Sequence, residues 1–169
     1  MLSQDVLDRA AALLNLYHSK GLMLATAESC TGGLIAACLT AIAGSSSTVE
    51  RGFVTYSNEA KNEAIGVDMG LIEAHGAVSE QVAGAMALGA LAHSRADATV
   101  SVTGVAGPGG GTPEKPVGLV YIGGARLGSR QPFVERHIFE GDRSAVRQAT
   151  VLAAFTMFEK LAEHQEPAG

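Results

Sequence analysis

Apolar residues recur three and four positions apart at the start of the chain. Val6, Ala10 and Leu13 belong to this pattern, which predicts an amphipathic helix from Ser3 to Lys20. Gly21 follows, and a glycine commonly ends a helix because it adopts the left-handed backbone conformation without a steric penalty. The chain therefore begins with a helix that has one buried face.

Residues suited to helix starts precede several later segments. Helices are predicted from the turn after Gly33 to about Ile42, from residues 57–59 onward, from Ser79 to about His93, and from Asp142 to roughly Glu163. Lys61 is expected in the first turns of the helix that begins at residues 57–59.

Short apolar runs rich in β-prone residues predict five strands. These are Leu22–Ala27, Phe53–Tyr56, Ala98–Thr103, Val117–Ala125 and Phe133–Phe139. The early strands alternate with helices, whereas the last two flank a turn at residues 128–130 and suggest an antiparallel hairpin. We expect one α/β layered domain over residues 1–169, with a mixed sheet covered by about five helices and a flexible tail at 164–169.

Three loops have a composition that suits a binding site. The glycine-bearing turn 29–33 and the glycine loop 103–111 each follow a predicted strand, and a polar run covers residues 44–47. The helix after Gly33 would aim free amides at an anion or a developing oxyanion, although Ser29 and Thr31 could simply cap that helix. The long glycine loop lacks the phosphate-loop and dinucleotide patterns, so it is a flexible connection or a ligand contact.

A lysine and a tyrosine lie where they could act on one of these serines. Lys61 follows Tyr56 by five positions, and a partly desolvated lysine can act as a base while a phenol relays a proton. The alternative for Lys61 is an ordinary solvated lysine. Arg143 stands at a helix start, where it is either a clamp for a phosphate or part of a surface ion pair.

Composition excludes several classes of protein. The chain has 169 residues, 47% of them hydrophobic, and a formal charge of -5, which argues against tracking a nucleic-acid backbone. Its two cysteines and five histidines lack disulfide or metal-ligand spacing, so we expect no metal. Because the two cysteines fit no disulfide framework, we expect a cytoplasmic protein. The start of the chain has no secretory pattern and no apolar run is long enough to span a membrane, so neither secretion nor membrane insertion is predicted.

Four sequence blocks resemble the CinA C-terminal family. They are Thr26–Gly33, Gly52–Lys61, His75–Ser79 and Thr103–Gly118, and Gly141-Asp142-Arg143 follows in its expected place. The resemblance implies an α/β domain whose relatives include stand-alone nicotinamide mononucleotide amidases. The sequence contains no counterpart of the molybdopterin-related N-terminal domain of longer CinA proteins, so we expect a stand-alone amidase. The resemblance to the CinA C-terminal family also implies a small-molecule nucleotide substrate, no cofactor, and a homodimer or larger homo-oligomer.

The same resemblance implies roles for individual residues. Ser29 would be the nucleophile, activated by Lys61 and Tyr56, with the tetrahedral oxyanion held by amides at the helix start. Arg143 would meet charge on the substrate, and the remaining contacts would come from Thr31, Gly32, Gly33, Ser46, Thr103, Gly104, Ala106 and Gly107. Ser46 and Ser47 remain open as alternative nucleophiles.

Three other functions stay open. The protein could bind a nucleotide without turning it over, it could hydrolyse a different small amide, or it could be a partner protein linked to DNA uptake or recombination. The acidic balance argues against direct contact with DNA.

Overall fold

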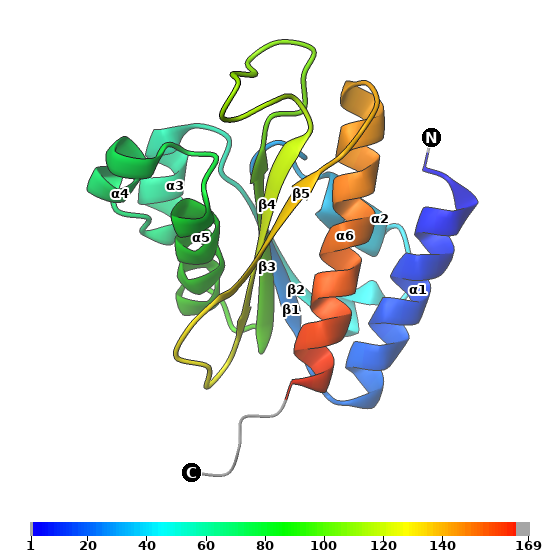
Figure 1. Ribbon diagram of the computed structural model, residues 1–169. Coiled ribbons are helices and arrows are strands. Elements are labelled where there is room, and N and C mark those ends of the chain that lie inside the picture. The colour runs from blue at the N-terminus through cyan, green and yellow to red at the C-terminus, as the bar shows by residue number, and fades with distance from the viewer. Residues whose placement is uncertain (1, 165–169) are drawn as a thin grey trace.

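In the computed structural model, which describes residues 2–164, five strands form one sheet in the order β2-β1-β3-β4-β5 (Figure 1). β1 pairs in parallel with β2 and β3, and β4 pairs antiparallel with β3 and β5. The strands are β1 (Leu24–Glu28), β2 (Val49–Val54), β3 (Ala98–Gly104), β4 (Leu119–Arg126) and β5 (Phe133–Ile138). The predicted mixed sheet with its antiparallel hairpin is confirmed.

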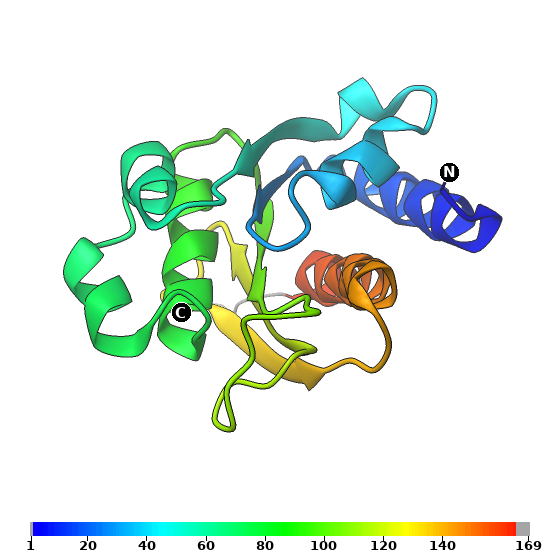
Figure 2. The ribbon, with the colours of Figure 1, turned by 90° about the horizontal axis from the view of Figure 1, so that it is seen from above.

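Helices cover both faces of this sheet, as Figures 1 and 2 show from two directions. One face carries α1 (Gln4–Ser19), α2 (Leu34–Thr40) and α6 (Arg143–Glu163), and the other carries α3 (Asn58–Ile65), α4 (Met69–His75) and α5 (Glu80–Ala92). The larger apolar core lies on the α1–α2–α6 side, and a smaller one lies under α3, α4 and α5. None of the helices within residues 2–164 is long and apolar enough to cross a membrane.

Two segments differ from the sequence prediction. β2 starts at Val49 and ends at Val54, whereas the predicted strand covered residues 53–56. As an edge strand, β2 includes the polar residues Glu50 and Arg51, so it has no apolar run to announce it. Helix α4 was not predicted, and it is short, with Asp68 as its N-cap. The tail expected at 164–169 lies, from residue 165 on, outside the described residues.

The parallel pairing of β1 with its two neighbours decides where a site can form. The carboxyl ends of β1, β2 and β3 lie at the same edge of the sheet, so the segments that follow Glu28, Val54 and Gly104 converge there. A short 3-10 turn, Ser45–Ser47, precedes β2 and therefore lies at the opposite edge, where Leu24 N donates to Thr48 O at 2.9 Å.

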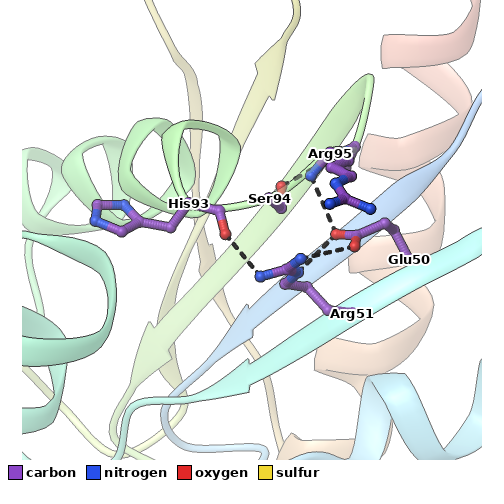
Figure 3. A network of polar contacts seen from close by, with 6 residues as sticks. Glu50, Arg51, His93, Ser94 and Arg95 are labelled. Atoms are coloured by element: carbon purple, nitrogen blue, oxygen red, sulfur yellow. Dashed lines mark hydrogen bonds and ion pairs between the residues drawn. The ribbon is translucent and has the colours of Figure 1, made fainter.

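A polar network fastens that opposite edge (Figure 3). The Glu50 carboxylate accepts from the Arg51 guanidinium at 2.7 and 2.9 Å and from the backbone amide of Arg95 at 3.1 Å. Arg51 also donates to the carbonyl of His93 at 3.0 Å, at the end of α5. These bonds tie the start of β2 to the segment that leads into β3.

Hydroxyl groups join β3 to the helical layer on the α5 side. Thr99, Ser101 and Thr103 alternate with apolar residues, and their hydroxyls donate to the carbonyls of Ala87, Ala83 and Ala77 at 2.6–2.7 Å. Because side chains alternate across a strand, all three point to the same face. This row holds α5 and the segment before it against the edge where the strands end.

Candidate active site

Ser29 lies directly after β1, at the edge where the parallel strands end. Its backbone N–H donates to Val102 O at 3.0 Å, and its carbonyl accepts from Gly32 N at 3.0 Å, which closes a tight turn. Strand alternation sends the side chain of Glu28 toward α2 and that of Ser29 to the opposite face, toward α3. The hydroxyl of Ser29 is therefore presented to a residue of α3.

That residue is Lys61. Its side chain is 1% exposed, and its Nζ lies 3.2 Å from Ser29 Oγ and 2.8 Å from Thr55 O. The salt bridges of the described residues include no acidic partner for Lys61. Burial lowers the pKa of the Lys61 amine below its usual value, because removal from water penalises the charged form. A neutral amine in contact with a serine hydroxyl can accept its proton.

A cleft of about 240 Å³ opens beside this pair. Figure 2 looks onto this end of the molecule, where the turn after β1, the glycine loop and the start of α6 come together. The cleft brings together seven residues proposed from the sequence, Ser29, Tyr56, Lys61, Thr103, Gly104, Ala106 and Arg143, and adds Cys30, Ala77 and Val78.

Tyr56 and Arg143 meet at the mouth of the cleft. Arg143 Nη2 donates to the Tyr56 hydroxyl at 3.2 Å, and Nη1 donates to Gly107 O at 2.8 Å. The Tyr56 side chain is largely exposed, and the described hydrogen bonds do not connect its phenol to Ser29 or Lys61. Because the phenol accepts from Arg143, its own hydrogen remains free to donate to a ligand.

Glu28 is a site residue that the sequence reasoning missed. Its carboxylate is fully buried and accepts from the amides of Ile35 at 2.8 Å and Ala36 at 3.0 Å, and from the hydroxyls of Thr31 at 2.7 Å and Thr26 at 3.3 Å. An acidic residue that ends a buried apolar strand was the available signal, because burying a carboxylate requires compensating donors.

This arrangement corrects the expected source of oxyanion stabilisation. We predicted that amides at the start of α2 face the reacting carbonyl, but the Glu28 carboxylate occupies that helix end. The Gly104 N–H is a better candidate. Val105 donates to Leu119 on β4, and alternate residues of a strand present their backbone groups to opposite neighbours, so Gly104 faces the space beyond the end of β1.

Five other predicted contacts do not line the cleft, and one of them, Gly107, only supports it through its carbonyl, which accepts from Arg143 at 2.8 Å. The Thr31 hydroxyl is buried on Glu28, and Gly32 and Gly33 form the turn behind Ser29 without lining the cleft. Ser46 lies in the 3-10 turn at the opposite edge of the sheet, because it precedes β2 rather than following it. We therefore remove Ser46, and with it Ser47, from the candidate site.

Cys30 lines the cleft beside Ser29 but does not suit the nucleophile's role. Burial raises the pKa of its thiol to about 11, and the thiolate is the reactive form of cysteine. No three His, Cys, Asp or Glu side chains within residues 2–164 gather in a way that could hold a metal ion. The polar side chains that line the cleft include the Ser29 hydroxyl and the Lys61 amine, which are in contact with each other.

Comparison with known proteins identifies a family and several relatives that resemble this chain. The CinA C-terminal domain model matches residues 7–162. A CinA-like protein of Citrifermentans bemidjiense is 54% identical over 89% of this chain, which spans 35% of that relative's length. The nicotinamide-nucleotide amidohydrolase PncC of Escherichia coli strain K12 is 50% identical over 86% of this chain and 88% of its own.

A solved structure agrees with the fold as a whole. The competence/damage inducible protein CihA of Agrobacterium tumefaciens superposes with a TM-score of 0.93 at 45% sequence identity, over 96% of this chain and 99% of that one. The chain thus spans about a third of the length of the Citrifermentans relative and nearly all of the Escherichia and Agrobacterium proteins.

Proposed function

Because this chain belongs to the CinA C-terminal domain family, we propose that it hydrolyses the carboxamide of nicotinamide mononucleotide, releasing nicotinate mononucleotide and ammonia, with Ser29 as nucleophile. The observation that carries the mechanism is the 3.2 Å contact between Ser29 Oγ and the Nζ of Lys61, a lysine buried without an acidic partner. The similarity to PncC supports the choice of substrate.

The first half of the reaction forms an acyl-enzyme. Neutral Lys61 accepts the Ser29 proton as Oγ attacks the amide carbon, which gives a tetrahedral intermediate. The Gly104 N–H, on the strand beside Ser29, donates to the oxyanion. The Lys61 ammonium then protonates the departing nitrogen, the C–N bond breaks, ammonia leaves, and the nicotinoyl group, still bearing its ribose phosphate, remains as an ester on Ser29.

The second half regenerates the enzyme. Water takes the place of ammonia, and Lys61, neutral again, removes a proton as the water oxygen attacks the ester carbon. The intermediate collapses with cleavage of the C–Oγ bond, and Lys61 returns the proton to Ser29. The product is the carboxylic acid, which ionises at neutral pH.

Tyr56 and Arg143 suit the charged end of the substrate. A guanidinium and a free phenol hydrogen at the mouth of the cleft can both donate to a phosphate, and hydrogen bonds to a charged group are stronger than neutral ones. We therefore assign Tyr56 to substrate binding rather than to activation of Ser29. Nicotinamide and its riboside, which lack the phosphate, should be poor substrates.

The test follows ammonia and nicotinate mononucleotide after incubation with nicotinamide mononucleotide in the presence of a chelator. We expect turnover by the parent protein, a loss of at least about a thousandfold in Ser29→Ala, and a loss of about a hundredfold to ten-thousandfold in Lys61→Met. Ser46→Ala is the matched serine control, since Ser46 lies at the far edge of the sheet, and it should keep the parent rate.

Each result has a definite meaning. Turnover that survives Ser29→Ala would move the nucleophile to another group. Absence of turnover by the parent protein, with binding of the nucleotide retained, would favour a binding module. Release of ammonia from another amide at a higher kcat/KM would change the substrate.

We also propose that the protein acts in the cytoplasm as a homodimer or larger homo-oligomer. Cys30 and Cys38 are both free and buried, which suits a reducing compartment. Light scattering coupled to size exclusion would measure the oligomeric state, and a monomer at micromolar concentration would contradict the proposed homo-oligomer.

A further inference from the structure

Glu28 connects the two halves of the Ser29–Lys61 pair. Its carboxylate holds the turn that follows Ser29 through the Thr31 hydroxyl and the first amides of α2. Its backbone carbonyl accepts from Thr55 N at 2.8 Å, and the carbonyl of that same Thr55 accepts from Lys61 Nζ at 2.8 Å. One residue thus holds the turn that bears the nucleophile and the peptide on which the base rests.

The carboxylate is committed to this position. It is fully buried, and each of its two oxygens accepts two hydrogen bonds. The salt bridges within the described residues do not include it. A second bond holds Thr31 from the other side, where Arg147 Nη2 donates to its carbonyl at 2.8 Å. The turn after Ser29 therefore has little freedom to move.

We infer that Glu28 is a positioning residue that sets the Ser29 hydroxyl against Lys61, an assignment that rests on the proposed amidase function. Glu28 lies on the opposite face of β1 from the cleft, and the residues that line the cleft do not include it. A change of its side chain alone therefore reaches the reaction through the placement of Ser29, and should appear in kcat rather than in KM.

Glutamine is an informative replacement at this position. Oε1 accepts from the Ile35 amide and Oε2 from the Ala36 amide, and neither amide can reverse its role. Whichever way the glutamine side chain turns, its NH₂ group faces an N–H donor. Glu28→Gln keeps the size of the side chain but must break one of these bonds and displace the start of α2.

The experiment compares kcat and KM for nicotinamide mononucleotide in the parent protein, Glu28→Gln and Glu50→Gln. Glu50 is the matched control, because its carboxylate also accepts a backbone amide and lies at the opposite edge of the sheet (Figure 3). We expect kcat to fall by about a hundredfold in Glu28→Gln with KM within about twofold, since a displacement near 1 Å can cost that much. Glu50→Gln should keep both parameters.

A second readout does not depend on the amide substrate. The rate at which a fluorophosphonate labels Ser29 should fall in Glu28→Gln in parallel with kcat. If Glu28→Gln does not fold, Thr31→Val removes one donor to the carboxylate and should lower kcat by about tenfold at constant KM.

The outcomes separate this inference from the proposed function. A parent protein without turnover refutes the function and removes the basis of the inference. A parent that turns over, together with a Glu28→Gln variant that keeps kcat or changes KM alone, overturns the positioning role. An equal loss in Glu50→Gln overturns it too, since the effect would then be a general one.

Discussion

Replacing Lys61 by methionine removes an amine while keeping an unbranched side chain at the same buried position. In the parent protein Lys61 is 1% exposed and has no acidic partner among the described salt bridges, and burial lowers the pKa of its amine. The unfolded chain exposes the amine to water, where its pKa is about 10.4. The folded and unfolded states therefore bind different numbers of protons at Lys61.

The sign of the effect follows from this difference. Between the folded pKa and the unfolded one, the unfolded state binds more protons, so the free energy of unfolding rises with pH. Its full slope is about 1.4 kcal/mol per pH unit for one proton, and it vanishes below the folded pKa and above the unfolded value. Lys61→Met has no such group, so the stability of the parent relative to the variant should rise with pH in that window and stay level outside it.

The variant also loses the hydrogen bond to Thr55 O, which is 2.8 Å long in the parent. A buried carbonyl left without its donor costs about 1–3 kcal/mol. That cost is independent of pH because a carbonyl does not titrate here. It changes the difference in free energy of unfolding between parent and variant by the same amount at every pH. The slope of this difference against pH therefore depends on Lys61 alone.

The assay is urea unfolding of both proteins between about pH 6 and pH 10, within the range where lysine protonation changes. The pH at which the difference curve starts to rise gives the folded pKa of Lys61. The same value should govern kcat/KM of the parent, which increases as Lys61 becomes neutral. A flat difference curve, or one that falls with pH, would refute the reasoning, because Lys61 would then carry its charge in the folded protein up to its ordinary pKa.

Three further predictions concern the cleft mouth and the helical layer. Tyr56→Phe removes the phenol at Arg143 and should raise KM for nicotinamide mononucleotide about tenfold with kcat within about threefold; a main effect on kcat in steady-state assays would return Tyr56 to the proton transfer. Arg143→Gln should raise KM for the nucleotide by tenfold or more, roughly, and leave KM for the riboside unchanged; equal effects on both would contradict a phosphate contact. Tyr17→Phe deletes the 2.7 Å bond from the buried Tyr17 hydroxyl to Phe158 O, and it should lower the free energy of unfolding by about 1 kcal/mol and Tm by roughly 2–4 °C; an unchanged Tm by calorimetry would show that this link between α1 and α6 contributes nothing.

Local patterns carried much of the fold. The spacing of apolar residues predicted α1, the N-cap residue Asp142 predicted α6, and runs of β-prone residues predicted β3 and the β4–β5 hairpin. Where the local signal was weak, as in the polar edge strand β2 and the short helix α4, the prediction shifted or missed the element. An edge strand and a short helix depend on their neighbours for stability, and that dependence leaves little trace in composition.

The candidate site was also predictable from the sequence only in part. Ser29 and the glycine loop follow strands, and their place at the carboxyl edge could be inferred from the order of elements. Ser46 is a similar serine in a similar polar run, and only the parallel pairing of β1 with β2 separates it from the cleft. Glu28 was passed over because its partners on α2 come from the next turn of chain rather than from a recognisable motif.

The sequence by itself determined the α/β class, the alternation of strands and helices, and the residue types available for acyl transfer, because periodicity, turn residues and motif blocks are properties of neighbouring positions. Only the tertiary structure decided that Lys61 is buried against Ser29, that the phenol of Tyr56 meets Arg143 instead, and that Glu28 fills the start of α2. These contacts join strand ends and helices that fold together across the sheet. Burial and desolvation, which make a lysine into a base, depend on that packing and on no local pattern.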